Sequence, residues 1–171
     1  MHRIARMVLR LSKAACVAAI ALFASLAAFG NLSDYGSNLP FVQHVLAMDT
    51  IFPGSTIGYR AIESPALQHA AYGLIIGLEC LTALLCWLGV FRLVRHRKAA
   101  ARDFNRAKSM AIAGLTLGFL TWHAGFMSIG GEWFGMWMSA DWNGTPSAFR
   151  FAASIMLVLI FLAQADTDLA P

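Results

Sequence analysis

Four long apolar blocks are the feature of this 171-residue sequence that most limits what it can fold into. They cover residues 14–30, 66–91, 110–130 and 149–163. The hydrocarbon core of a bilayer is about 30 Å thick, and about 20 mainly apolar helical residues cross it. Charged residues make up only 13% of the chain, whereas a soluble domain has about 25%. The sequence therefore predicts one domain over residues 1–171, an all-α integral membrane bundle of four transmembrane helices.

Positive charges predict how these helices are oriented. Eleven of the thirteen Lys and Arg residues lie before residue 14 or in the segment 92–109. Basic segments of membrane proteins stay on the cytoplasmic side. We therefore expect both termini and the basic inner loop 92–109 in the cytoplasm, and the loops 31–65 and 131–148 outside. Because the positive charges only flank apolar blocks, no nucleic-acid partner is predicted.

The sequence also predicts features of the two ends of the chain. A basic start, an apolar stretch and the small-residue sequence 28–30 also describe a secretory signal peptide. Cleavage before Asn31 would leave three spans. The length of the first block favours an uncleaved anchor, which leaves four. At the other end, the short acidic sequence from Asp166 to Asp168 is expected to be a solvated terminus.

Small residues predict close contacts between helices. Gly73 and Gly77 form one GxxxG pattern, and Gly114 and Gly118 form another. This pattern lets helix backbones approach closely in lipid. It predicts a compact bundle and leaves open whether each contact lies within one chain or between chains.

Three ionisable residues inside the apolar blocks are candidates for function, namely His69, Glu79 and His123. Placing a charged group at the centre of a membrane helix costs about 2.5–3.5 kcal/mol on insertion scales, so such a group needs a partner. Glu79 is interpreted as a hydrogen-bonded structural group, with a proton or solute pathway as an alternative. His69 and His123 lie at similar predicted depths, so a haem- or metal-binding redox component is another alternative. No cofactor is predicted, because no nucleotide loop, nucleophile elbow, paired CxxC or CxxCH motif occurs.

The first outer loop contains a candidate short helix that lies on or dips into the membrane interface. Pro40 can start a helix, and the residues after it place Phe41, Val45 and Met48 on one side. The sequence Phe52-Pro53-Gly54 is expected to end this helix.

The second outer loop has three tryptophans within ten positions, Trp133, Trp137 and Trp142. An aromatic belt at headgroup depth is one interpretation, and a binding surface is the other. The nearby acids Glu132 and Asp141 favour binding, because an anchor does not need them. The residues predicted to bind a partner protein are Asp34, Tyr35, His44, Asp49, Glu132, Trp133, Trp137 and Trp142.

Sequence motifs in both loops resemble a known bacterial family. These motifs are Asp34-Tyr35, Ser37-Asn38, Phe41-Val42, His44-Val45-Leu46, Met48-Asp49-Thr50, Phe52-Pro53, Tyr59-Arg60-Ala61-Ile62, Gly130-Gly131-Glu132-Trp133-Phe134, Met136-Trp137 and Trp142-Asn143-Gly144. Together they resemble the predicted small integral membrane proteins of bacteria, domain of unknown function 2165, over nearly the whole chain. The resemblance implies a bacterial inner-membrane protein with four spans and names no substrate or activity.

The leading functional hypothesis is a non-enzymatic membrane subunit or scaffold. The spans are built from Ala, Leu and Gly, whereas the outer loops combine aromatic rings, acids and His44 without repetition. Binding surfaces on rigid scaffolds have this character. We expect the two loops to contact another membrane or periplasmic protein, and the lipid bilayer to be the other partner.

Overall fold

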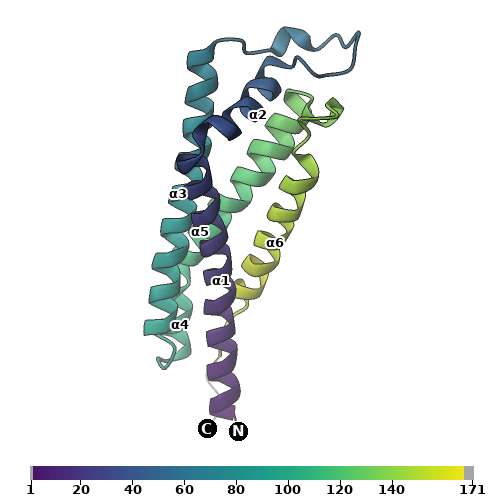
Figure 1. Ribbon diagram of the computed structural model, residues 1–171. Helices are drawn as coiled ribbons and strands as arrows, with labels where there is room; N and C mark the ends of the chain where they lie inside the picture. Colours follow the sequence, from purple (N-terminus) through teal and green to yellow (C-terminus); the bar gives the residue numbers. More distant parts are fainter. Residues whose placement is uncertain (1, 168–171) are drawn as a thin grey trace.

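Four long apolar helices run along the molecule (Figure 1). The computed structural model describes residues 2–167, and the four helices cover Ile4–Ser33, Pro65–Arg95, Ala101–Trp133 and Thr145–Ala163. Each is long and apolar enough to cross a membrane. Residues 2–167 contain no β-strand. The predicted all-α membrane bundle of four helices is therefore confirmed.

The spans and loops divide into the following elements. The spans are α1 (His2–Ser33), α3 (Pro65–Arg95), the composite of α4 (Ala101–Ala107), α5 (Ser109–Leu120) and the π-helix η2 (Thr121–Trp133), and α6 (Thr145–Ala163). The loops carry α2 (Tyr35–Ala47) and two short 3-10 helices, η1 (Gly58–Arg60) and η3 (Met136–Met138). We call the end with residues 34–64 and 131–148 the aromatic end, and the end with residues 92–109 the basic end.

The helix in the first loop begins earlier than the sequence predicts. α2 starts at Tyr35 and contains Pro40 at its sixth position, so the prediction that Pro40 starts it is wrong. Pro40 lies past the first turn, whose N–H groups have no partner within the helix, so it removes one helical hydrogen bond, the one to the Gly36 carbonyl. α2 ends at Ala47, before the predicted Phe52-Pro53-Gly54, because Met48 adopts a left-handed conformation with φ 53°. It slants from the end of α1 toward the third span (Figure 1), and its place at a membrane interface stays a prediction.

α3 packs against both α1 and α5. Its contact with α5 is close because glycines carry no side chain there. A Cβ built on Gly89 would lie 2.6 Å from backbone atoms of Ala111, and one built on Gly114 would lie 2.7 Å from Sγ of Cys86. One built on Gly118 would lie 3.0 Å from a methyl group of α3. The GxxxG pattern of α5 therefore packs helices within the chain.

The GxxxG pattern of α3 has no such contact. Gly73 and Gly77 are exposed, and a Cβ on either would have no atom within 4 Å. Both glycines lie on the side of α3 that faces away from the rest of the chain. Small residues thus bring helices together only where the rotation of each helix places them at the contact.

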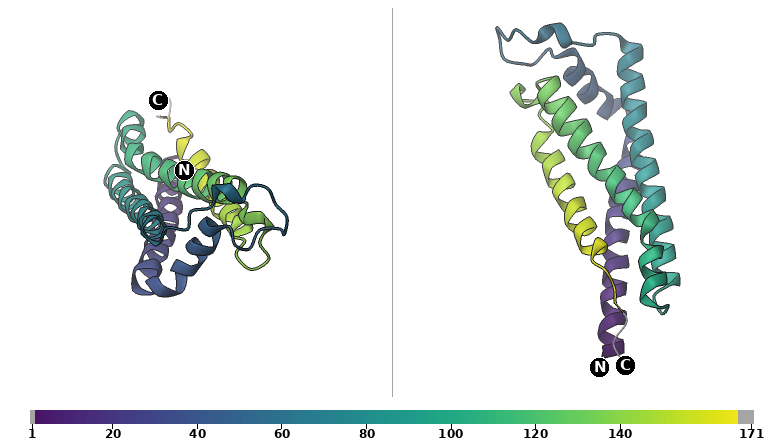
Figure 2. Two further views of the ribbon diagram at one scale, coloured as in Figure 1. Left: turned by 90° about the horizontal axis from the view of Figure 1, so that it is seen from above. Right: turned by 180° about the vertical axis from the view of Figure 1, so that it is seen from behind.

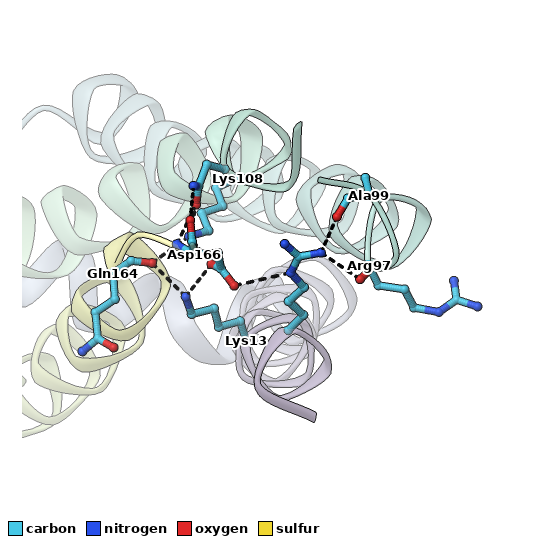
Figure 3. Close-up of polar contacts among 8 residues, drawn as sticks. Lys13, Arg97, Ala99, Lys108, Gln164 and Asp166 are labelled. Carbon is cyan, nitrogen blue, oxygen red and sulfur yellow. Dashed lines mark hydrogen bonds and ion pairs between the residues drawn. The ribbon is translucent and has the colours of Figure 1, made fainter. Parts of the chain in front are cut away.

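Buried charges join the beginning of the chain to its end at the basic end (Figure 3). The Asp166 carboxylate lies 2.8 Å from Nζ of Lys13 and 2.6 Å from Nζ of Lys108, and Nε of Arg10 lies 3.5 Å from its other oxygen. All four side chains are at most 3% exposed. The prediction of a solvated terminus is therefore wrong for Asp166, while Asp168 lies outside the described residues.

Backbone carbonyls accept further hydrogen bonds from these cations. Lys13 and Lys108 both donate to the carbonyl of Gln164, at 2.8 and 2.7 Å. Burial raises the pKa of the Asp166 carboxyl, but the hydrogen bonds and charges of Lys108 and Lys13 outweigh burial and hold that pKa below its usual value. The carboxylate thus ties α1, the third span and the segment after α6 together.

Candidate functional site

The two loops at the aromatic end interlock. The Thr50 hydroxyl donates to Oγ of Ser139 at 2.9 Å, and the backbone N–H of Trp142 donates to the same oxygen at 2.9 Å. Gly135, just before η3, has a positive φ of 65°, and a Cβ there would lie 3.3 Å from the side chain of Ile57. The first loop therefore packs over a turn of the second loop that needs glycine.

His44, Asp49 and Trp142 form a second set of contacts at this end. Nδ1 of His44 lies 2.8 Å from Oδ2 of Asp49, and its ring stacks on Trp142 with centroids 4.5 Å apart. Phe41 meets the Trp142 ring edge-on at 6.2 Å. Three of the residues predicted to bind a partner thus hold the two loops in place.

Trp133 and Trp137 project outward instead, with 52% and 45% of their surface exposed. The guanidinium of Arg60 lies 4.6 Å from the ring centre of Trp133 and 5.4 Å from that of Tyr59. Nη1 of Arg60 also donates to the Trp133 carbonyl at 3.2 Å. These contacts hold the arginine in one place although it remains accessible.

Phe52 and Trp137 form a second outward-facing pair. Their rings meet at 89° with centroids 5.6 Å apart, and Phe52 is 54% exposed. Together with the arginine group they form the aromatic patch, which we define as Phe52, Tyr59, Arg60, Trp133 and Trp137. The sequence does not single out Phe52, Tyr59 or Arg60 as site residues, although Arg60 is one of only two basic residues outside the basic end.

The two remaining acids among the predicted partner-binding residues are both exposed. Glu132 lies on the last turn of η2, next to Trp133 of the aromatic patch. Asp34 lies apart from that patch, at the turn between α1 and α2, where its carbonyl accepts from the N–H of Ser37 at 3.2 Å. The predicted set is thus spread over two regions of the surface.

A polar network, distinct from the aromatic patch, joins α1, α2 and α3. Nδ2 of Asn31 donates to Oε2 of Glu79 at 2.8 Å, and the Tyr72 hydroxyl donates to Oδ1 of Asn31 at 3.2 Å. The Tyr35 ring packs on Tyr72, and its hydroxyl lies 2.7 Å from Nδ1 of His69. Glu79 is 3% exposed. Its carboxyl group is thus buried and has a hydrogen-bond donor.

Asn31 is not among the residues that the sequence predicts for this network. The sequence places it just beyond the first apolar block, in a loop, whereas α1 continues through it to Ser33. A buried carboxyl group needs a donor on a neighbouring helix, and an amide at the end of an apolar block is a candidate donor. That requirement is the signal that could have identified Asn31.

His69 and His123 have different partners. His69 pairs with Tyr35 of α2, whereas the His123 ring stacks on Phe119 of its own span with centroids 5.0 Å apart. Within residues 2–167, no group of three or more His, Cys, Asp or Glu side chains is arranged to hold a metal ion. A haem or metal role for the two histidines stays a prediction.

The family comparison agrees with this architecture. The family described as predicted small integral membrane protein, domain of unknown function 2165, matches residues 9–165. No curated protein and no solved structure matches the chain. The matched region includes all four apolar spans except the first residues of α1, and it includes the aromatic patch and the polar network. The chain therefore belongs to the family of predicted small integral membrane proteins with domain of unknown function 2165.

Proposed function

We propose that this protein is a non-catalytic subunit or scaffold of a bacterial inner membrane, which binds a second membrane or periplasmic protein through the aromatic patch. The observation that carries the proposal is that exposed aromatic rings and an arginine stand on a base of two interlocked loops. Trp, Tyr and Arg supply a disproportionate share of the binding energy at protein interfaces.

The order within the patch favours binding over simple anchoring. An aromatic belt requires rings at headgroup depth and nothing more. Here Arg60 is held by a backbone carbonyl and two rings, and the loops beneath are joined by hydrogen bonds. Side chains that are already ordered lose less conformational freedom on association. The patch therefore suits recognition of a folded partner.

The test is quantitative co-purification from nanodiscs with a double variant, Trp133→Ala and Trp137→Ala. The matched control is Trp87→Ala, because Trp87 of α3 is 43% exposed and lies outside the aromatic patch. We expect a reproducible partner to be recovered with the wild type and the control, and to be lost with the double variant. Recovery of the same proteins at the same yield with all three would contradict the proposal.

We further propose that the basic end faces the cytoplasm and the aromatic end the periplasm. The distribution of Lys and Arg supports this orientation. A membrane-impermeant maleimide applied to intact cells should label Tyr59→Cys, because Tyr59 is 79% exposed at the aromatic end. It should not label Arg102→Cys, which is exposed at the basic end. The reverse pattern would show the opposite orientation, and wild-type protein gives the background.

A further inference from the structure

An apolar cavity of about 380 Å³ lies between α2, α3 and the third span. Its volume lies within the range of about 300–1,000 Å³ that is typical of small-molecule sites. Thr121 is the one polar side chain in its wall, and its hydroxyl already donates to the Leu117 carbonyl. The cavity therefore offers no unsatisfied polar side chain, and it suits an apolar part of a ligand, such as a hydrocarbon chain.

The cavity exists because α3 and the third span diverge. The two helices touch through Gly89 and Gly114, and they separate toward the aromatic end (Figure 2). A Cβ on Gly125 of η2 would meet no atom within 4 Å, so the wall also lacks a side chain there. α2 contributes Val42 and Val45 to another wall. The space is thus built from both the helix divergence and a missing side chain.

Side chains that line the cavity also face the surroundings of the bundle. Leu74 of α3 is 63% exposed, and Leu120 and Ile129 of the third span are 49% and 55% exposed. These residues belong to helices that are long and apolar enough to cross a membrane. The cavity therefore opens sideways, toward hydrocarbon, and an apolar chain could enter without crossing water.

A cation is hydrogen-bonded to the backbone next to one wall residue of this cavity. Arg60 donates to the carbonyl of Trp133, the residue directly before Phe134, which lines the cavity. Arg60 and Arg150 are the only basic residues outside the basic end. Arginine pairs well with phosphate, and Trp and Tyr prefer the depth of lipid headgroups. An apolar cavity and a guanidinium bonded to the residue before one of its wall residues are together complementary to an anionic lipid.

We propose that this cavity binds one acyl chain of an anionic phospholipid whose phosphate pairs with Arg60. A bilayer supplies such chains at the side opening, and the lining atoms gain van der Waals contacts that an empty space does not offer. The acyl chain enters from the side of the bundle, whereas the aromatic patch faces outward. Arg60 belongs to both sites, but Trp133 and Trp137 of the patch do not line the cavity.

The test counts the lipids that stay bound after reconstitution. Protein in nanodiscs of equal parts phosphatidylglycerol and phosphatidylethanolamine is released into mild detergent and weighed by native mass spectrometry. We expect one retained phospholipid per chain, with phosphatidylglycerol preferred about fivefold because of the arginine. A wild-type protein that retains no lipid would overturn the proposal.

Variants that fill the cavity provide the direct test. Gly125→Leu places a side chain in the space, and Ala71→Leu does so from the α3 wall, so a folding defect in one does not remove the test. Gly77→Leu is the matched control, because it adds the same side chain on an open face of α3 outside the cavity. We expect the filled variants to lose most of the retained lipid and the control to keep it. Equal retention in all three would overturn the proposal.

The headgroup contact is tested separately. Arg60→Gln should abolish the preference for phosphatidylglycerol. Arg150→Gln should preserve it, because Arg150 donates to Ser147 on its own helix, away from the cavity wall. An unchanged preference in Arg60→Gln would overturn the assignment of the phosphate to Arg60.

Discussion

At the residue scale, Asp166 controls the arrangement of the basic end. Its carboxylate lies among the buried side chains of Arg10, Lys13 and Lys108, which come from two spans far apart in the sequence. Without a negative charge between them these cations would repel one another in a region with little water. The stability of the basic end therefore depends on the charge of one carboxylate.

We expect Asp166→Asn to lower the free energy of unfolding by about 3–5 kcal/mol, because it leaves buried cations without their counter-charge. Asp103→Asn is the matched control, since Asp103 is an exposed acid at the same end and should change stability little. Unfolding in detergent micelles, followed by circular dichroism, measures both. Equal effects of the two substitutions would contradict the structural role of Asp166.

The same carboxylate predicts a dependence on pH. The pKa of Asp166 is lower in the folded protein than its ordinary value of 3.8, so the folded state holds this proton less strongly than the unfolded state. Its contribution to stability is therefore complete above the unfolded pKa and is lost as the pH falls through the folded pKa. We expect the melting temperature of the wild type to decline below about pH 4 more steeply than that of Asp166→Asn. If the melting temperatures of the two proteins decline equally with pH, the carboxylate of Asp166 does not make this contribution to stability.

Glu79 allows a test of its hydrogen bond. Glu79→Gln keeps an oxygen that can accept from Asn31, so the free energy of unfolding should change by less than about 1 kcal/mol. Glu79→Leu leaves the amide of Asn31 without this acceptor and should cost about 1–3 kcal/mol. Thermal unfolding of both variants in one detergent measures the two losses of stability. If Glu79→Gln is as unstable as Glu79→Leu, the network requires the carboxyl group itself and not only an acceptor.

At the element scale, the rotation of α3 decides what each of its glycines does. Gly89 faces the backbone of Ala111 at a distance that excludes a Cβ, whereas Gly77 faces open space. We expect Gly89→Ala to lower the free energy of unfolding by about 1–3 kcal/mol through overpacking. Gly77→Ala, the same change on the same helix, should be neutral or slightly stabilising. Chemical unfolding of the pair measures the difference, and similar losses for both would refute this packing of α3 and α5.

The number and nature of the spans can be predicted from the sequence because the length of an apolar block is a local property. α3 begins at Pro65 and α6 ends at Ala163, each within one residue of the predicted bound. The role of Asp166 cannot be predicted in this way, because its partner Lys13 lies 153 positions away. The contacts of Gly73 are also unpredictable, because neighbouring helices determine which face of α3 is buried.

In the candidate site, too, some features could be predicted from the sequence and others could not. Composition alone identifies both loops as the chemically complex part of the chain. It does not separate Trp142, which packs against His44, from Trp133 and Trp137, which are exposed. That difference arises from hydrogen bonds between the loops, such as the one from Thr50 to Ser139. The region could therefore be predicted, whereas the role of each ring depends on tertiary contacts.

At the scale of the whole molecule, α1 makes structural contacts along most of its length. Its first half supplies Arg10 and Lys13 to the buried charges at the basic end. Its middle supplies Val17 and Ala21 to the core, where both are fully buried. Its last turns supply Asn31 to Glu79. Loss of residues before Asn31 would therefore leave Asp166 with fewer cations and uncover the core face of α3.

We accordingly expect the first span to remain attached as a membrane anchor in the mature protein. Intact-mass spectrometry of protein purified from membranes through a C-terminal tag should give a chain that retains residues before Asn31. As a control for the role of α1, a chain that starts at Asn31 behind an unrelated cleavable signal should accumulate poorly or unfold at a lower temperature. A purified wild-type protein whose mass corresponds to a start at Asn31, with unchanged stability, would show that the remaining three spans form the bundle alone.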